Sequence, residues 1–155
     1  MSNQVASQLQ VARARASTVL ESLVPVAMLL ARLAVGLLFE STGWGKVHNI
    51  PKVTAFFVKL GIPLPGFQAV LVGWSELLCG TALVIGLLTR LATIPLIVSM
   101  VVAILTAKLA DIHGVFDLVG QDEFTYLVML VVIAVVGPGK FSLDRLIARR
   151  LDEAA

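Results

Sequence analysis

Charged side chains and cysteine are both scarce in this sequence of 155 residues. Only 14 % of the residues are charged, against about 25 % in soluble domains, whereas 58 % are hydrophobic and the mean hydropathy is +0.95. This composition argues against a soluble domain and excludes intrinsic disorder. The single cysteine, Cys79, excludes an intrachain disulfide framework, a CxxC redox pair and a zinc or iron–sulfur site built from several cysteines.

The sequence also lacks a run of basic residues. Its net charge is +2 and its lysines and arginines are dispersed, so the sequence has no basic patch of the kind that binds nucleic acid. The length suits one domain. We therefore interpret the chain as a small integral membrane protein whose surroundings are the lipid bilayer.

Four hydrophobic stretches reach or approach the about 20 residues that a helix needs to cross a bilayer. They cover residues 23–44, 67–88, 91–108 and 121–137. The predicted fold is all-α, a four-transmembrane-helix bundle over residues 23–140. An N-terminal tail (1–22) and a basic amphipathic tail (141–155) flank this membrane domain.

Two connections have clear local signals. The segment Pro51–Leu60 begins with proline and places Phe56 and Phe57 between two lysines, which predicts a short amphipathic helix in the membrane interface. The second and third stretches are separated only by Leu88–Leu91, which predicts a tight helical hairpin.

The two sides of the predicted bundle differ in their content of basic residues. One side carries seven: Arg13, Arg15, Arg90, Lys140, Arg145, Arg149 and Arg150. The other carries four: Lys46, Lys52, Lys59 and Lys108. Because lysine and arginine favour the cytoplasmic side, we expect both termini to be cytoplasmic.

Three charged residues fall inside the first two predicted spans, where a charge costs roughly 2.5–3.5 kcal/mol. Arg32 and Glu76 each lie about nine residues from a span end, or about 14 Å deep at the helical rise. We therefore expect them to form an intramembrane pair. Glu40 lies nearer the outer side, where it could meet Lys108. The pair has an alternative interpretation as a structural contact that only fixes helix register.

Regular spacing of small residues predicts close approach of the first two spans. Arg32, Gly36, Glu40 and Trp44 recur every four residues, and Gly73, Glu76 and Gly80 recur every three or four. Small residues let helices approach closely in lipid. The two stripes therefore predict a tight contact between these spans.

Polar and aromatic residues collect in the outer half of the predicted bundle. The candidate ligand-binding residues are Glu40, Trp44, Trp74, Lys108 and Tyr126. Further polar candidates on that side are Lys46, His48, Asp111 and His113. An apolar pocket with a few convergent polar groups is typical of a small-molecule site. The alternatives are packing or interfacial tryptophans and solvated loop histidines, and no metal site is expected.

Four segments resemble the DoxX family of small bacterial membrane proteins. They are RLAVGLLFESTGWGKVHNIPKVTAFFVKLGIPLP (Arg32–Pro65), GWSELLCGTALVIGLLTRLATIPL (Gly73–Leu96), ILTAKLADIHG (Ile104–Gly114) and EFTYLVMLVVIAVVGPGKFSLD (Glu123–Asp144). The resemblance covers nearly the whole chain except both tails, and it implies a four-helix bundle in a bacterial inner membrane. It points to Arg32, Glu40, Lys46, Glu76 and Lys108 as functional positions, and no established catalytic motif carries over.

Three functions are compatible with these features. The resemblance to DoxD-like membrane subunits of thiosulfate:quinone oxidoreductase implies a quinone-linked redox or oxidative and thiol-stress component. Its cofactors would lie outside the chain, and quinone would be its ligand. The second hypothesis is a non-catalytic anchor for soluble oxidoreductases or a sulfurtransferase. The third is a small proton-coupled transporter, which would require a homo-oligomer because the sequence shows no internal repeat.

Overall fold

The computed structural model describes residues 2–154, with side chains at positions 13, 17, 18 and 20–153, and within this part the fold is all-α. The α-helices are α1 (Ser2–Val47), α2 (Ile50–Lys59), α3 (Pro65–Ile85), α4 (Thr89–Ala103), α5 (Val115–Val119), α6 (Asp122–Val136) and α7 (Leu143–Ala154). The terminal residues of the two predicted tails, Met1 and Ala155, and the side chain of Arg15 lie outside the described part.

Within the described part of the chain, three helical segments are long and apolar enough to cross a membrane. They are Leu20–Val47, Pro65–Ile85 and Thr89–Asp111. The last comprises α4, a π-helical stretch (Ile104–Lys108) and a 3₁₀ turn. Helix α6 has 15 residues and is about 22 Å long, less than the roughly 30 Å of a hydrocarbon core. The all-α class is thus confirmed with three candidate spans, and the fourth crossing stays a prediction.

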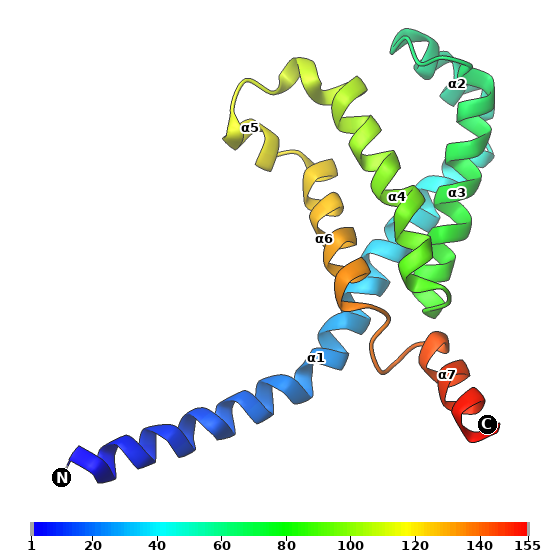
Figure 1. The fold of residues 1–155 in the computed structure, drawn as a ribbon. Coiled ribbons are helices and arrows are strands. Elements are labelled where there is room, and N and C mark those ends of the chain that lie inside the picture. The colour runs from blue at the N-terminus through cyan, green and yellow to red at the C-terminus, as the bar shows by residue number, and fades with distance from the viewer. Residues whose placement is uncertain (1, 155) are drawn as a thin grey trace.

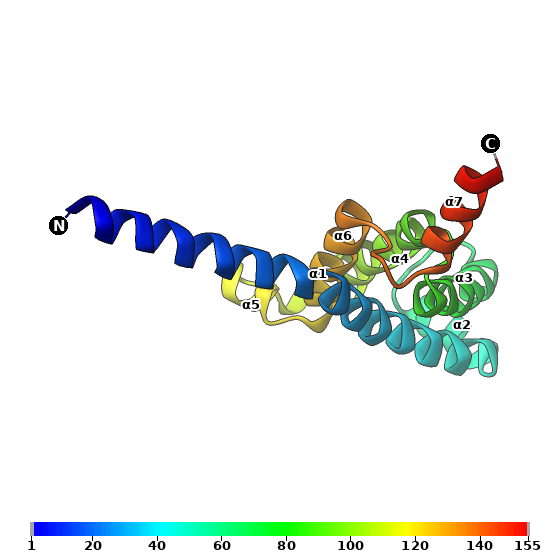
Figure 2. The same ribbon diagram turned by 90° about the horizontal axis from the view of Figure 1, so that it is seen from below.

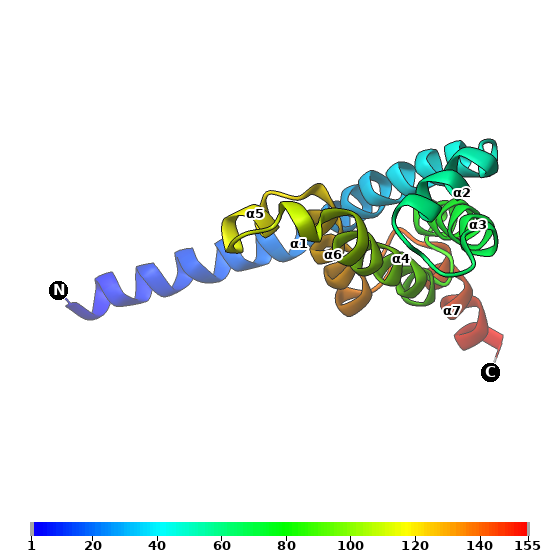
Figure 3. The same ribbon diagram turned by 90° about the horizontal axis from the view of Figure 1, so that it is seen from above.

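Four helices form the bundle: α1 lies along α3, and α4 lies along both α3 and α6 (Figure 1). The start of α1 and helix α7 lie at one end of this bundle, called the terminal end below. Helices α2 and α5 lie at the other end, called the loop end. The N-terminal part of α1 projects beyond the bundle, as the views from below and above show (Figures 2 and 3).

The hydrophobic core lies where the four bundle helices meet. Its fully buried apolar side chains include Val35, Phe39, Leu83, Leu96, Leu130 and Ile133. The predicted hairpin is confirmed: α3 ends at Ile85 and α4 begins at Thr89. Gly86 turns the chain with φ +72°, a conformation that glycine adopts most readily. The predicted amphipathic helix is confirmed as α2, with Pro51 in its first turn.

Glycines bring α1 and α3 into close contact, as the two stripes predicted. A Cβ atom on Gly43 would lie 2.3 Å from the backbone nitrogen of Leu77, and one on Gly80 would lie 2.5 Å from the nitrogen of Glu40. Gly36 is comparably tight, since its Cβ would lie 2.8 Å from a methyl group of Val84. We call Gly36, Gly43 and Gly80 the glycine seam. It fixes the register of the two antiparallel helices.

Candidate functional site

A buried carboxylate, Glu76, forms the centre of a polar cluster within the bundle. Its side chain is 1 % exposed. Its Oε2 atom accepts a hydrogen bond of 2.9 Å from the Thr42 hydroxyl and forms an ion pair with Lys46. Its Oε1 atom accepts a 3.1 Å hydrogen bond from the Ser99 hydroxyl. Side chains from α1, α3 and α4 therefore converge on one carboxylate, as a charge buried in an apolar bundle requires.

Two members of this cluster reach the surface: Thr42 is exposed, and Lys46 is partly exposed. Lys46 lies in the last turn of α1, and 29 % of its side chain is exposed, whereas Glu76 is sealed. The glycine seam holds this end of α1 close to α3. The cluster can consequently meet a molecule from outside through the Lys46 ammonium group. Thr42 was missed in the sequence, although its spacing of four residues from Lys46 places both on one helix face.

The predicted pair of Arg32 with Glu76 is wrong. The guanidinium of Arg32, also 1 % exposed, donates instead to the backbone oxygens of Pro138 and Phe141, the latter at 2.7 Å. Its Nε atom has no hydrogen-bond partner among the described residues. The two buried charges are thus satisfied separately.

Helix register explains why they are apart. Gly86, which directly follows α3, lies against the Arg32 guanidinium, while Leu77, next to Glu76 on α3, lies against Gly43. The two levels on α1 differ by 43 − 32 = 11 residues, or about 16 Å at the helical rise. The sequence prediction estimated the membrane depth of each residue from its distance to the predicted end of its span, and this placed both residues at the midplane. The estimate failed because it did not include the points at which the two helices contact each other.

The Arg32 contacts belong to a compact structure at the terminal end. Asp144, just inside α7, accepts hydrogen bonds from the backbone N–H groups of Leu88 (2.7 Å) and Thr89 (2.9 Å). Its own backbone N–H donates to the Gly86 oxygen at 3.0 Å. Asp144 therefore caps the first turn of α4, whose own N-cap residue supplies no capping side chain. Because Arg32 binds the segment that leads to Asp144, these residues fasten the C-terminal segment to the bundle.

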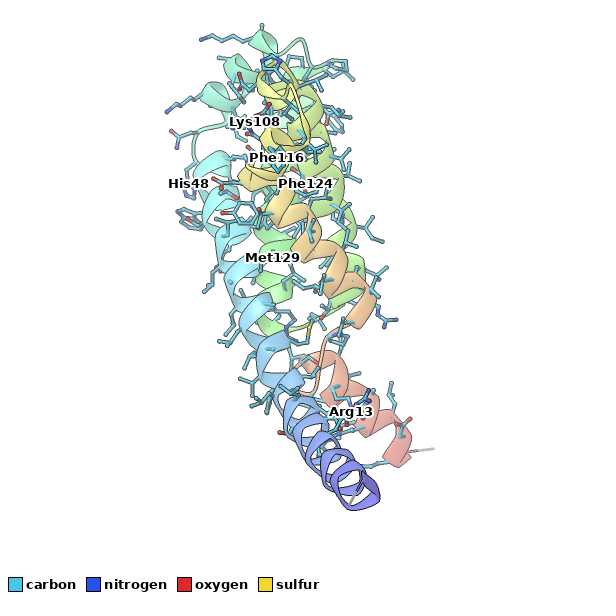
Figure 4. All side chains as sticks on the ribbon, turned by 90° about the vertical axis from the view of Figure 1, so that its left-hand side faces the viewer. Arg13, His48, Lys108, Phe116, Phe124 and Met129 are labelled. Atoms are coloured by element: carbon cyan, nitrogen blue, oxygen red, sulfur yellow. The ribbon has the colours of Figure 1, made fainter. Side chains whose placement is uncertain are left out.

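The predicted meeting of Glu40 with Lys108 is also wrong. Lys108, at the end of the π-helical stretch, forms an ion pair of 3.5 Å with Glu123 of α6. Figure 4 shows Lys108 toward the loop end, opposite Arg13. Glu40 is partly buried and makes no hydrogen bond or ion pair with any residue that the structure describes.

The five predicted ligand-binding residues do not form one contact cluster in the described structure. Trp44 and Trp74 are 60 % and 47 % exposed, whereas Tyr126 packs edge-on against core residue Phe39, with ring centroids 6.4 Å apart. A step of four residues turns a helix by about 400°, so a stripe drifts about 40° per step. The stripe that starts at buried Arg32 has therefore reached the outer surface by Trp44.

The remaining polar candidates lie apart from the Glu76 cluster. His48 stacks on Trp44 with ring centroids 4.2 Å apart, and its Nδ1 atom lies 2.9 Å from the Trp44 backbone oxygen. Figure 4 shows His48 on the side of α1 that faces away from the other bundle helices. Asp111 and His113 are exposed on the connection that follows α4. Of the further polar candidates, only Lys46 therefore joins the buried carboxylate.

Comparisons with known proteins agree with this architecture. The DoxX family model matches residues 27–109, more than half of the chain. "Uncharacterized membrane protein Rv3486" of Mycobacterium tuberculosis is 36 % identical over 137 residues, covering 81 % of this chain and 84 % of the relative. "Inner membrane protein YqjF" of Escherichia coli is 30 % identical, covering 84 % of this chain and 99 % of the relative.

A further relative, from Bacillus subtilis, bears the name "Putative oxidoreductase CatD". It is 31 % identical, covering 77 % of this chain and 85 % of the relative. No solved structure matches the chain. The family model, the extent of these matches and the apolar helices together show that the chain is a multi-pass inner-membrane protein of the DoxX family.

Proposed function

We propose that this protein is a quinone-linked redox component of the inner membrane, with Glu76 and Lys46 as its working groups. The observation that carries the proposal is the buried carboxylate of Glu76, which is ion-paired to the half-buried Lys46. Reduction of a quinone consumes protons, so its site needs a group that donates to a carbonyl oxygen and a group that holds a proton. The oxidoreductase name of the Bacillus relative supports the same chemistry.

The roles of the two residues follow from their exposure. The Lys46 ammonium can donate a hydrogen bond to a quinone carbonyl, because part of its side chain is exposed. Glu76 balances the charge of Lys46 and can take up a proton. Thr42 and Ser99 hold its two oxygen atoms in place. Electrons would come from a soluble oxidoreductase, the partner class that this proposal requires.

A ligand-induced shift in thermal unfolding tests the proposal, with menadione as the probe and the full chain in lipid nanodiscs. A ligand that binds the folded state raises the unfolding midpoint in a saturable way. We expect this rise in the native protein and its loss in Lys46→Met. Lys46→Arg should restore part of it, because arginine keeps the charge and the donors. Lys52→Met is the matched control, since Lys52 is exposed on α2.

A Lys46→Met protein that keeps the full menadione response would refute the proposed site. The same variants can be expressed in cells and challenged with menadione. If the native protein protects cells and Lys46→Met does not, the binding result gains a physiological readout. Protection without any ligand response in vitro would favour a role as a membrane anchor.

Four crossings with both termini in the cytoplasm complete the proposal. Helix α6 runs back toward the terminal end, so the N-terminus and α7 lie at the same end (Figure 1). Single cysteines at Asn3 and Asn49, in a Cys79→Ser background, can be labelled with a membrane-impermeant maleimide. We expect labelling from outside the cell only at Asn49. Labelling at Asn3 from outside the cell would show that the orientation is opposite to the one proposed.

The anchor role has one observation in its favour. Helix α7 leaves apolar side chains uncovered, with Leu146, Ile147 and Leu151 46–66 % exposed. A soluble oxidoreductase or sulfurtransferase could dock on this face. Truncation after Asp144 would then abolish stress protection in cells and leave the menadione response of the purified protein intact. Loss of neither property would exclude the anchor role for α7.

A further inference from the structure

Glu40 differs from the other ionisable residues inside the spans. Arg32, Lys46 and Glu76 all have polar partners, whereas Glu40 has neither a hydrogen bond nor an ion pair within the described structure. It lies 47 − 40 = 7 residues inside the end of the first span at Val47. An ionisable residue at such a position is expensive in lipid unless something compensates it. The chain therefore carries an acidic group whose partner is not among the described residues.

Glu40 lies next to the part of the α1 surface that faces the lipid. Gly36 and Gly43, four residues before and three after it, lie in the glycine seam against α3. Leu37 and Trp44, three residues before and four after it, are 53 % and 60 % exposed. Residues three and four apart are neighbours on a helix. Glu40 thus lies on the border between the seam and the lipid-facing surface of α1.

Trp74 of α3 lies beside the same seam. Leu77 contacts Gly43, and Trp74, three residues before Leu77, is 47 % exposed. Its neighbour Gly73 faces Lys46 and Val47, so Trp74 lies about six residues, or about 9 Å, further along the seam than Glu40. Trp44 lies between these levels. The two tryptophans, the only ones in the chain, therefore border the seam beyond Glu40.

The chemistry of these three residues selects a class of ligand. An acidic group calls for a cation, and the surrounding lipid requires that cation to be hydrophobic. The two basic residues of α1 that are nearest to Glu40 in sequence, Arg32 and Lys46, already have partners, and the same would hold in a second copy of the chain. Tryptophan rings attract cations through their negatively charged faces. We propose that Glu40, Trp44 and Trp74 form a lipid-facing binding site for hydrophobic organic cations.

Two probes of the same shape and opposite charge test this site. The full chain in nanodiscs is titrated with tetraphenylphosphonium or with tetraphenylborate, and tryptophan fluorescence reports binding. We expect saturable quenching by the cation and none by the anion. Glu40→Gln should weaken cation binding at least tenfold. Glu21→Gln, the same change at an exposed position of α1, should leave it unchanged.

The tryptophans are tested by equilibrium dialysis of radiolabelled tetraphenylphosphonium, because their replacement alters the fluorescence signal. Trp44→Leu and Trp74→Leu should each weaken binding about three- to tenfold. Glu40→Asp keeps the charge and should retain more affinity than Glu40→Gln, so a variant that folds poorly does not decide the result. Three outcomes would each overturn the proposal: no saturable binding, equal binding of the borate, or a Glu40→Gln protein with native affinity.

Discussion

Two levels of the bundle each bury a charge, but they satisfy it with different groups. At the terminal end, Arg32 donates to the backbone oxygens of Pro138 and Phe141. About 16 Å further along the bundle toward the loop end, Glu76 is held by side chains of Thr42, Lys46 and Ser99. Backbone oxygens move only with the chain that carries them, whereas side chains can change rotamer and partner. The first arrangement suits a fixed joint, and the second suits a site that exchanges partners.

The local backbone follows the same division. At the terminal end, one carboxylate, Asp144, binds two N–H groups at the start of α4. At the loop end, α4 passes into a π-helical stretch at Ile104–Lys108. This conformation is rare in proteins, and where it occurs it is often found at a functional site. We therefore expect mutations at the terminal end to affect folding most, and mutations at the loop end to affect binding as well.

Replacement of Arg32 should give the largest loss of stability. Arg32→Met keeps most of the buried volume but leaves two backbone oxygens without donors and frees the segment before α7. A buried acceptor left without a donor typically costs about 1–3 kcal/mol, so the loss of both contacts should cost about 3–5 kcal/mol. Unfolding by SDS titration in mixed micelles measures the change. The menadione response of the remaining folded protein should persist.

Arg90→Met provides the control for this prediction. Arg90 is exposed and makes one hydrogen bond of 3.3 Å, to the Val135 oxygen. Its replacement should cost less than about 1 kcal/mol. Equal losses for the two arginines would mean that the contact of Arg32 with the C-terminal segment contributes nothing particular to folding.

Close helix contact at the glycine seam should rank second. Gly43→Ala would place a methyl group 2.3 Å from the backbone nitrogen of Leu77, and a backbone atom cannot move aside alone. We expect a loss of about 2–3 kcal/mol, in the range of overpacked cores, together with weaker menadione binding because Lys46 would shift away from Glu76.

Gly45, two residues further along α1, has open space around it. Gly45→Ala should therefore be neutral or stabilise the protein by up to about 1 kcal/mol, since alanine favours helix over glycine. The two substitutions are measured in the same SDS titration. Equal effects would show that the α1–α3 distance is looser than the seam implies.

Much of the fold could be predicted from the sequence because the signals are local. Apolar runs define the long helices, Pro51 begins α2, and the short link at Leu88 requires a hairpin. The spacing of Gly36 and Gly80 indicates the α1–α3 contact. The π-helical stretch could not be predicted, because its residues do not differ in kind from those of α4.

The partners of the buried charges could not be predicted, since they depend on register between helices. Depth counted from span ends placed Arg32 beside Glu76, whereas the seam separates them by about 16 Å. The true partners of Arg32 are backbone oxygens, which have no residue signature. The segment Gly137–Gly139 indicated only the end of a helix. Lys46 was found through the family resemblance, and Thr42 was missed.

A double-mutant cycle compares the pair predicted from the sequence, Arg32 with Glu76, with the observed ion pair, Lys46 with Glu76. Lys46→Met and Glu76→Gln remove the two ends of one ion pair, so their effects on unfolding should be coupled by about 1–2 kcal/mol. Arg32→Met and Glu76→Gln affect separate clusters and should be additive within about 0.5 kcal/mol. A coupling of the second pair as large as that of the first would restore the intramembrane pair of Arg32 with Glu76.

The cap formed by Asp144 should have the smallest effect of the four. Asp144→Ala leaves the N–H groups of Leu88 and Thr89 without their acceptors, and loss of an N-cap costs about 1 kcal/mol. The loss stays modest because Arg32 still holds Phe141, three residues earlier. Asp152→Ala, an exposed position on the same helix, should change stability by less than about 0.5 kcal/mol. If the two aspartates prove equivalent in SDS titration, the joint at the terminal end consists of Arg32 alone.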